Sequence, residues 1–121
     1  MAYLALSRRA ALDLIDIDLF STQKWGATIA QQYLMSFEEA LSRLREDPRL
    51  LRTNPQLSTH FGLYRIRKHF LIGIVAEENV YILAVKHGAV DLPTQLLELE
   101  PTLLREAELL HHKYLRSIQG S

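Results

Sequence analysis

Two apolar runs separated by a polar turn constrain the fold of this chain more than any other feature. The runs are Phe70-Leu71-Ile72 and Tyr81-Ile82-Leu83, and Glu77-Glu78-Asn79 lies between them. Short continuous apolar runs are typical of central strands that are covered on most sides, and a short polar connection is typical of a hairpin. We therefore predict strands at residues 69–76 and 80–87, joined as a hairpin and preceded by a strand at residues 63–67.

Two amphipathic helices are predicted upstream of these strands. Ser7 is a good N-cap for the first helix, which should fade near residues 21–22 and has the apolar stripe Ala11, Leu12, Ile15 and Leu19. The second helix should run from about Trp25 to Arg45 and end at Asp47-Pro48, with the stripe Ile29, Ala30, Tyr33, Phe37, Ala40, Leu41 and Leu44. Neither helix can bury its stripe alone. The sequence therefore predicts an α+β fold in which a helical hairpin packs on a small antiparallel sheet.

The remaining segments are shorter or less regular. Residues 3–6 are apolar and compatible with a strand, and residues 49–62 are predicted to be a loop because turn residues punctuate them. Pro101 suits the first turn of a helix, and a shorter helical stretch at residues 94–99 is compatible with the sequence before it. The apolar stripe of this C-terminal helix is Leu103, Ala107, Leu110, Tyr114 and Ile118, widened by Leu104 and Leu115. We expect residues 93–121 to form a helical extension of a domain that spans residues 1–92.

Composition excludes several classes of protein. With 121 residues the chain fits a single domain. It contains no cysteine, which excludes disulfides, thiolate zinc sites and cysteine nucleophiles, and which fits a reducing cytoplasm. Residues 1–4 lack the pattern of a signal peptide, and no apolar stretch approaches the ~20 residues of a membrane span. Glycine-rich phosphate loops, zinc-protease motifs and nucleophile elbows are absent, so we expect no cofactor and no metal. His111 and His112 are adjacent on a helix, about 100° apart, and do not readily share an ion.

The charges balance overall but are unevenly distributed. Fourteen basic and fourteen acidic residues give a net charge of zero, which argues against a broad electrostatic grip on nucleic acid. Residues 43–69 nevertheless hold seven Arg and Lys against two acids, and residues 77–108 hold seven acids against two cations. A basic docking surface and an ordinary solvated surface are both compatible with this pattern.

Two histidines near the strand ends are the candidates for chemistry. His69 follows Arg65, Arg67 and Lys68, and His87 follows Lys86. A histidine among cations, with Tyr64 and Tyr81 in the same sheet, could support acid–base cleavage of RNA, with arginines holding the phosphate. The alternative is that His69 caps a hairpin and the cations are solvated.

The same region resembles a known family. The arginine-rich strand leading to His69, and the ending His87-Gly88-x-x-Asp91, resemble the ParE branch of the RelE/ParE toxin superfamily of type II toxin–antitoxin systems. Leu6-Ser7 before the first helix, Trp25-Gly26 opening the second, and Tyr33 within it fit the same pattern. The resemblance covers about residues 3–92.

The resemblance implies partners rather than a substrate. A cognate antitoxin would fold across the toxin, and the implied target is DNA gyrase; the sister branch instead cuts messenger RNA in the ribosomal A site. No membrane contact and no direct sequence-specific binding of nucleic acid are expected, whereas a dimer or a hetero-oligomer with the antitoxin is compatible with the family. Ala84 and Ala89 stand where the family commonly has arginines, which weakens the RNA-cutting alternative, and Gly73 replaces a usual aromatic residue. A relative that has lost toxicity and only binds the antitoxin is a third possibility.

Two sets of residues follow as candidates for binding. The candidates for contact with the target are Arg65, Arg67, Lys68, His69, His87 and Asp91, although Asp91 is also placed to cap the following turn. The helical candidates for the antitoxin site are Leu12, Ile15, Leu19, Tyr33 and Phe37, which we expect to be core residues whose outer neighbours meet an antitoxin helix. The first strand, with Tyr3 and Leu6, is predicted to have an edge that can accept an added strand.

Overall fold

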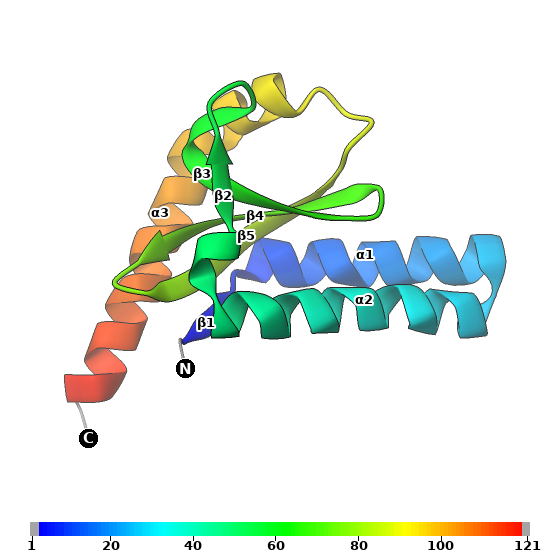
Figure 1. Cartoon of the computed structure of the whole chain (residues 1–121), viewed down its shortest axis with the longest axis horizontal. Coiled ribbons are helices and arrows are strands. Elements are labelled where there is room, and N and C mark those ends of the chain that lie inside the picture. The colour runs from blue at the N-terminus through cyan, green and yellow to red at the C-terminus, as the bar shows by residue number, and fades with distance from the viewer. Residues whose placement is uncertain (1–2, 120–121) are drawn as a thin grey trace.

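The computed structural model describes residues 3–119. Residues 1, 2, 120 and 121 lie outside this part, so half of the segment 1–4, which was compared with a signal peptide, is not described. The elements in chain order are β1 (Leu4–Leu6), α1 (Arg8–Trp25), α2 (Ala27–Glu46), the 3-10 turn η1 (Pro48–Leu50), β2 (Arg52–Asn54), β3 (Ser58–Ile66), β4 (His69–Ala76), β5 (Asn79–His87) and α3 (Leu92–Gln119). Figure 1 shows the α1–α2 hairpin on one side of the sheet and α3 running along the other side. The chain is thus a three-layer α+β structure.

The sheet has five strands in the order β1-β5-β4-β3-β2. The neighbours from β2 to β5 pair in antiparallel fashion, and the predicted hairpin of β4 and β5 is confirmed. The prediction of a wholly antiparallel sheet is wrong, because β1 pairs parallel to β5, with Leu4 opposite Val80. No tight turn joins β1 to its neighbour; the whole helical hairpin lies between β1 and the rest of the sheet, and such a crossover permits the parallel direction.

The predicted loop at residues 49–62 is wrong. This segment contains η1, β2 and the first half of β3. A Cβ atom on Gly62 would lie 2.8 Å from Cγ of Leu51, so only glycine lets the chain before β2 approach β3 this closely. Gly73 has a similar role in β4, because an added Cβ would lie 2.4 Å from the carbonyl oxygen of Tyr81, where the β4–β5 register shifts. The usual aromatic residue of the family therefore does not fit at position 73.

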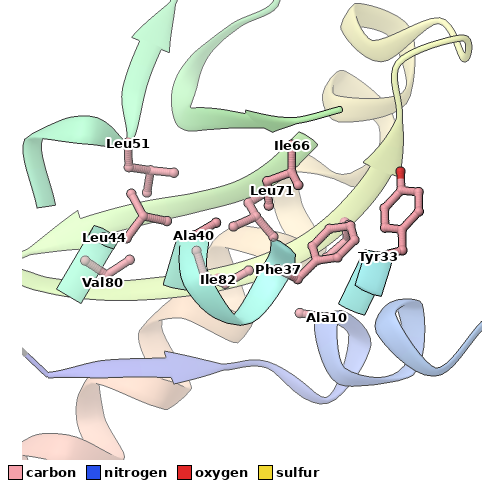
Figure 2. Close-up of a cluster of buried hydrophobic side chains, with 11 residues drawn as sticks. Ala10, Tyr33, Phe37, Ala40, Leu44, Leu51, Ile66, Leu71, Val80 and Ile82 are labelled. Carbon is pink, nitrogen blue, oxygen red and sulfur yellow. The ribbon is translucent and has the colours of Figure 1, made fainter. Parts of the chain in front are cut away.

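The predicted helical hairpin is confirmed, but its first helix is longer than predicted. The hydroxyl of Ser7 accepts from the N–H of Ala10, as an N-cap should, but α1 continues to Trp25 and ends only at Gly26, whose φ is 87°. The stripe of α2 is buried mostly as predicted, at Ala30, Tyr33, Phe37, Ala40 and Leu44, with Leu41 half-buried and Ile29 exposed. Figure 2 shows side chains of α2 against Leu71, Val80 and Ile82 of the sheet.

The predicted stripe of α1 faces the solvent instead of the core. Leu12, Ile15 and Leu19 are 50%, 54% and 59% exposed. The face toward the rest of the domain carries Ala10 and Ser21, both buried, with Leu14 and Ile17 packed on the core beside them. Asp13 lies on the sheet side as well, because its carboxylate accepts from the N–H of Val85 at 2.9 Å. Apolar residues occur all round α1, so their spacing alone did not identify the buried face.

The helix α3 starts earlier than predicted. It runs unbroken from Leu92 to Gln119, with Pro101 inside it, so neither a start at Pro101 nor a separate helix at residues 94–99 is correct. Asp91 caps it, since its carboxylate accepts from the backbone N–H of Thr94 at 3.4 Å and from the hydroxyl of the same residue at 2.7 Å. A proline in a helix interior costs about 3 kcal/mol relative to alanine, but the buried stripe continues across it at Leu92, Leu96, Leu103 and Ala107. These residues form a second core with Phe61, Leu63, Ile72, Tyr81, Leu83 and Ala84.

None of the helices within residues 3–119 has an apolar stretch long enough to cross a membrane.

Candidate functional site

A notch lies where the far half of the helical hairpin meets the ends of β4 and β5. In Figure 1 the hairpin extends past the sheet on the side where β3 turns into β4. The notch has a volume of about 300 Å3 and is lined by Asp16, Ile17, Phe20, Ser21, Lys24, Trp25, Tyr33, Lys68, His69 and His87. The notch combines aromatic rings with two lysines and two histidines, and it is the candidate functional site.

Tyr33 and His69 form the fixed centre of the notch. The hydroxyl of Tyr33 lies 2.6 Å from Nδ1 of His69. Burial raises the pKa of Tyr33, so its hydroxyl keeps the proton; because the hydroxyl also accepts from the backbone N–H of Lys68, we assign its proton to the contact with Nδ1. Burial, with a smaller contribution from the charge of His87, lowers the pKa of His69 to about 4. His69 is therefore neutral near pH 7, with Nδ1 as the acceptor and the proton on Nε2.

His87 has the same tautomer for a different reason. The backbone N–H of Ala89 donates to Nδ1 of His87 at 2.9 Å, which leaves the proton of the neutral ring on Nε2. The rings of His69 and His87 are edge to face, with centroids 4.9 Å apart. Two imidazoles that each carry the proton of the neutral ring on Nε2 thus line one notch.

The turn between β3 and β4 positions the cations of the notch. Arg67 has a φ of 54°, a left-handed conformation that is unfavourable for a residue with a side chain. Two interactions hold it: Nε of Arg65 donates to the carbonyl oxygen of Arg67 at 2.8 Å, and the guanidinium of Arg67 lies 5.4 Å from the centroid of the Tyr33 ring. Lys68 follows in the same turn, and its place beside His69 is set by this strained backbone.

The target candidates divide between two neighbouring hollows. Lys68, His69 and His87 line the notch, and Arg67 stacks on its Tyr33. Arg65 and Asp91 line a second hollow of about 400 Å3, which shares Lys68 and His87 with the notch. The guanidinium of Arg65 lies 5.7 Å from the centroid of the Phe70 ring, and the carboxylate of Asp91 caps α3. The six candidates are therefore close together but do not form one cluster.

The tyrosines considered for RNA cleavage lie elsewhere. Tyr81 is fully buried on the α3 side of the sheet and shares a hydrogen bond with His111, and Tyr64 interacts with Arg43. The tyrosine that meets His69 is Tyr33, from α2. Among residues 3–119 no group of three His, Asp and Glu side chains could hold a metal ion.

Comparison with known proteins agrees with this fold. The family model described as ParE toxin of type II toxin–antitoxin system, parDE, matches residues 4–92, which is well over half of the chain. The chain belongs to the ParE toxin family. The resemblance identified in the sequence is thereby confirmed.

A solved structure is similar to this ParE-family chain. It is the chromosomal ParDE TA system from P. aeruginosa, with a TM-score of 0.63 and 18% identity, and the match covers 72% of this chain and 96% of that one. At this identity the likeness shows the shared fold alone. No curated protein sequence matches the chain. The part of α3 after Leu92 lies beyond the residues that the ParE model matches.

The antitoxin candidates of this ParE-family chain also divide into two groups. Tyr33 and Phe37 are 9% and 1% exposed and belong to the core, as predicted. Leu12, Ile15 and Leu19 were predicted to be core residues first, and that is wrong, because they form an exposed stripe on α1. Tyr3 and Leu6 flank an edge strand, as predicted, since β1 has a neighbour in the sheet on one side only. A groove of about 530 Å3 runs between Leu6, Ser7 and Arg8 and the C-terminal half of α3.

Sequence reasoning missed six lining residues of the notch, all on α1: Asp16, Ile17, Phe20, Ser21, Lys24 and Trp25. The end of the first helix was predicted near residues 21–22, and Trp25 was assigned only to the opening of the second helix. The available signal was the length of α1, since a helix that ends at Gly26 carries these side chains past the end of the sheet.

Proposed function

We propose that this chain is a toxin that inhibits DNA gyrase and is neutralised in the cytoplasm by a cognate antitoxin. The family match over residues 4–92 carries this proposal. The toxin fold is assigned to residues 1–92 and the helical extension to residues 93–121. The protein acts by docking on macromolecules rather than by catalysis.

The exposed stripe of α1 supports the antitoxin half of the proposal. Leu12, Ile15 and Leu19 follow the i, i+3, i+7 spacing of one helix face and are at least half exposed. Fully burying a leucine or isoleucine side chain contributes about 1.5–3 kcal/mol, so an amphipathic antitoxin helix gains stability by covering them. The free edge of β1, beside Leu6, offers a place for an added strand of the same partner.

The basic end of the sheet supports the target half. Arg67 and Lys68 are exposed in a rigid turn, and exposed His87 lies beside them across β4 and β5. Cations at the end of a sheet favour contact with an acidic surface. Arg65 and Asp91 border this end from the second hollow.

Plasmid supercoiling by purified DNA gyrase tests the target. We expect the unaltered chain to stop supercoiling or to accumulate cleaved DNA, and we expect Lys68→Glu to reduce the effect at least tenfold, because a reversed charge would face the target surface. Arg116→Glu, exposed near the end of α3, is the matched control and should inhibit normally. Unchanged gyrase activity at micromolar excess of the unaltered chain would overturn the proposal.

A second experiment separates the antitoxin from the target. In cells that express the adjacent antitoxin gene, Ile15→Glu should escape neutralisation while still inhibiting gyrase, because the charge prevents burial of the stripe. Leu97→Glu is the control, since Leu97 is 71% exposed on α3 and lies neither in this stripe nor in the groove beside Leu6. If Ile15→Glu is neutralised as well as the unaltered chain, the antitoxin does not bind α1.

Ribosome-dependent cleavage of messenger RNA is the second candidate function. The observation in its favour is the pair of histidines 4.9 Å apart, with Tyr33 and Arg67 beside them. Arg65 borders the second hollow rather than the notch, which removes one of the expected phosphate ligands. Incubation with ribosome-bound RNA tests it: cleavage that disappears in His69→Gln supports a nuclease, and absence of cleavage by the unaltered chain removes it.

A chain that binds its antitoxin but leaves growth unchanged on induction would be a non-toxic relative.

A further inference from the structure

The notch has an aromatic wall that the core of the protein does not use. Phe20 and Trp25 are 58% and 43% exposed, and their rings meet edge to face with centroids 6.1 Å apart. Large rings left in solvent beside a hollow are typical of sites that stack a planar ligand. The volume of about 300 Å3 is at the lower end of the ~300–1,000 Å3 found for small-molecule sites.

The opposite wall of the notch supplies donors for an anion. Lys68 lines the notch together with His69 and His87, whose Nε2 atoms both carry the proton in the neutral rings. Lys24 adds a cation at the aromatic wall, because its ammonium lies 5.0 Å from the centroid of the Trp25 ring and 5.6 Å from that of Phe20. An oxyanion with several oxygens can accept from such a set of donors at once.

One acidic residue distinguishes between anionic ligands. Asp16 is the single carboxylate among the lining residues of the notch. It would repel a simple anion, but it can accept from the exocyclic amino group of a nucleobase. Aromatic rings, one carboxylate and a group of N–H donors are together complementary to a nucleotide, which has a π-face, an amino group and a phosphate.

We propose that the notch binds one nucleotide, with its base against Phe20 and Trp25 and its phosphate against Lys68, His69 and His87. The same chemistry is present in a free nucleoside monophosphate and in an unstacked nucleotide of a single strand. The net charge of zero argues against a long phosphate-binding track, so the site takes one nucleotide rather than a tract. The site shares Lys68 and His87 with the gyrase surface proposed above, but binding of a nucleotide does not depend on that proposal.

The chain carries its own reporter for this site, because Trp25 is its only tryptophan. Titration of the full-length chain with AMP should change the tryptophan fluorescence in a saturable way. Adenosine, which lacks the phosphate, should bind at least tenfold more weakly, because charge-assisted hydrogen bonds to Lys68 and the imidazoles are lost. Inorganic phosphate should also bind at least tenfold more weakly, because stacking on the rings is lost.

Variants locate the ligand within the notch. Lys68→Ala should weaken AMP about tenfold and leave the affinity for adenosine unchanged. Phe20→Ala should weaken AMP and adenosine alike, by about tenfold. Lys113→Ala, an exposed lysine on α3, is the matched control and should bind AMP normally. Unchanged circular dichroism and thermal unfolding show that each variant is folded.

The outcomes separate the two sources and the alternatives. A single-stranded tetranucleotide that binds much more tightly than AMP identifies nucleic acid as the source, and equal affinities identify the free nucleotide; both support the proposal. Absence of a saturable signal at millimolar AMP, or inorganic phosphate binding as tightly as AMP, overturns it. A chain that binds AMP but leaves gyrase active refutes the proposed function alone.

Discussion

Each face of the sheet holds a tyrosine hydrogen-bonded to a histidine, and the two pairs differ in their surroundings. On the hairpin face the hydroxyl of Tyr33 lies 2.6 Å from Nδ1 of His69, and on the α3 face the hydroxyl of Tyr81 lies 2.7 Å from Nδ1 of His111. The other ring nitrogen of His69 belongs to a notch lined by lysines and a second histidine. That of His111 lies 3.5 Å from a carboxylate oxygen of Glu77.

This difference shows that the helix packed over a tyrosine–histidine pair decides whether the pair can contact a ligand or only supports packing. Burial raises the pKa of both tyrosines, so each hydroxyl keeps its proton. Each hydroxyl also accepts another hydrogen bond, from the backbone of Lys68 for Tyr33 and from the amide of Asn79 for Tyr81, which leaves its proton for the histidine. Because α1 and α2 extend past the sheet (Figure 1), the first pair, Tyr33 and His69, borders the notch. Both pairs join a helix to a strand, but the second lies under α3, which runs along the sheet. The first pair is therefore placed for binding and the second for packing, and four predictions test this distinction.

The largest expected effect concerns the packing of α3. Leu103 is fully buried between α3 and the sheet, so Leu103→Ala should lower the free energy of unfolding by about 2–5 kcal/mol, through lost burial and a cavity. Leu109→Ala is the matched control on the same helix, and at 62% exposure it should change stability by no more than about 0.5 kcal/mol. Urea unfolding measures both. Equal effects would show that α3 does not seal this face.

The second prediction concerns the pH dependence at the notch. The pKa of His69 is lowered from 6.5 to about 4 in the folded protein, mainly by burial, so the unfolded chain binds more protons between these values. Stability contributed by His69 is complete above pH 6.5 and is lost as the pH falls toward 4. The loss is at most about 3 kcal/mol, and solvent at the partly buried ring reduces it.

The measurement is the difference in unfolding free energy between the unaltered chain and His69→Gln at each pH. This difference should fall steadily between pH 6.5 and 4 and become constant below. His112→Gln, exposed on α3, is the control for loss of a histidine outside the notch. A difference that does not change with pH would mean that His69 is already protonated or is freely solvated in the folded protein.

The third prediction compares the two hydroxyl groups directly. Tyr81→Phe should destabilise the protein by about 1–2 kcal/mol, because Tyr81 is fully buried and His111 would lose its donor under α3. Tyr33→Phe should cost less, about 0.5–1 kcal/mol, because water in the notch can replace the hydroxyl beside His69. Thermal unfolding of the two variants in parallel checks the order. The reverse order would contradict the assignment of packing to the α3 face.

Much of the fold on the hairpin face could be predicted from the sequence. The strands β4 and β5 follow from two short apolar runs with one polar connection, and the buried face of α2 follows from a single clear stripe. The face of α1 could not be predicted, because apolar residues surround the helix and the sheet-side acceptor, Asp13, is charged. The start of α3 could not be predicted either. Proline favours the first turn of a helix, but Pro101 lies in the interior of α3. The helix nevertheless continues through it, because Asp91 caps its start and its buried stripe packs on the sheet on both sides of the proline.

The candidate site was predictable only in part. His69 and His87 were identified because they stand at the ends of strands beside cations, and pairing of β4 with β5 places them opposite one another. Tyr33 could not be assigned to His69, since the two are 36 residues apart in sequence and the contact depends on how the hairpin docks. The same docking brings Phe20 and Trp25 to the notch. Local pattern therefore identified residue types and strand partners, but the relative placement of the layers decides which side chains share a site.

The smallest expected effect is at the edge of the α3 face, where Glu77 approaches His111. The side chain of Glu77 is 71% exposed, so water screens this contact, and exposed ion pairs contribute about 0–1 kcal/mol. Glu77→Gln should therefore destabilise the protein by about 0.5 kcal/mol or less at low salt, and the effect should disappear at high salt. Glu78→Gln is a matched control, because Glu78 lies in the same turn with the same left-handed backbone. If Glu77→Gln costs more than about 1 kcal/mol at high salt, the carboxylate is shielded from water, and the second pair is closed at its edge as well as under α3.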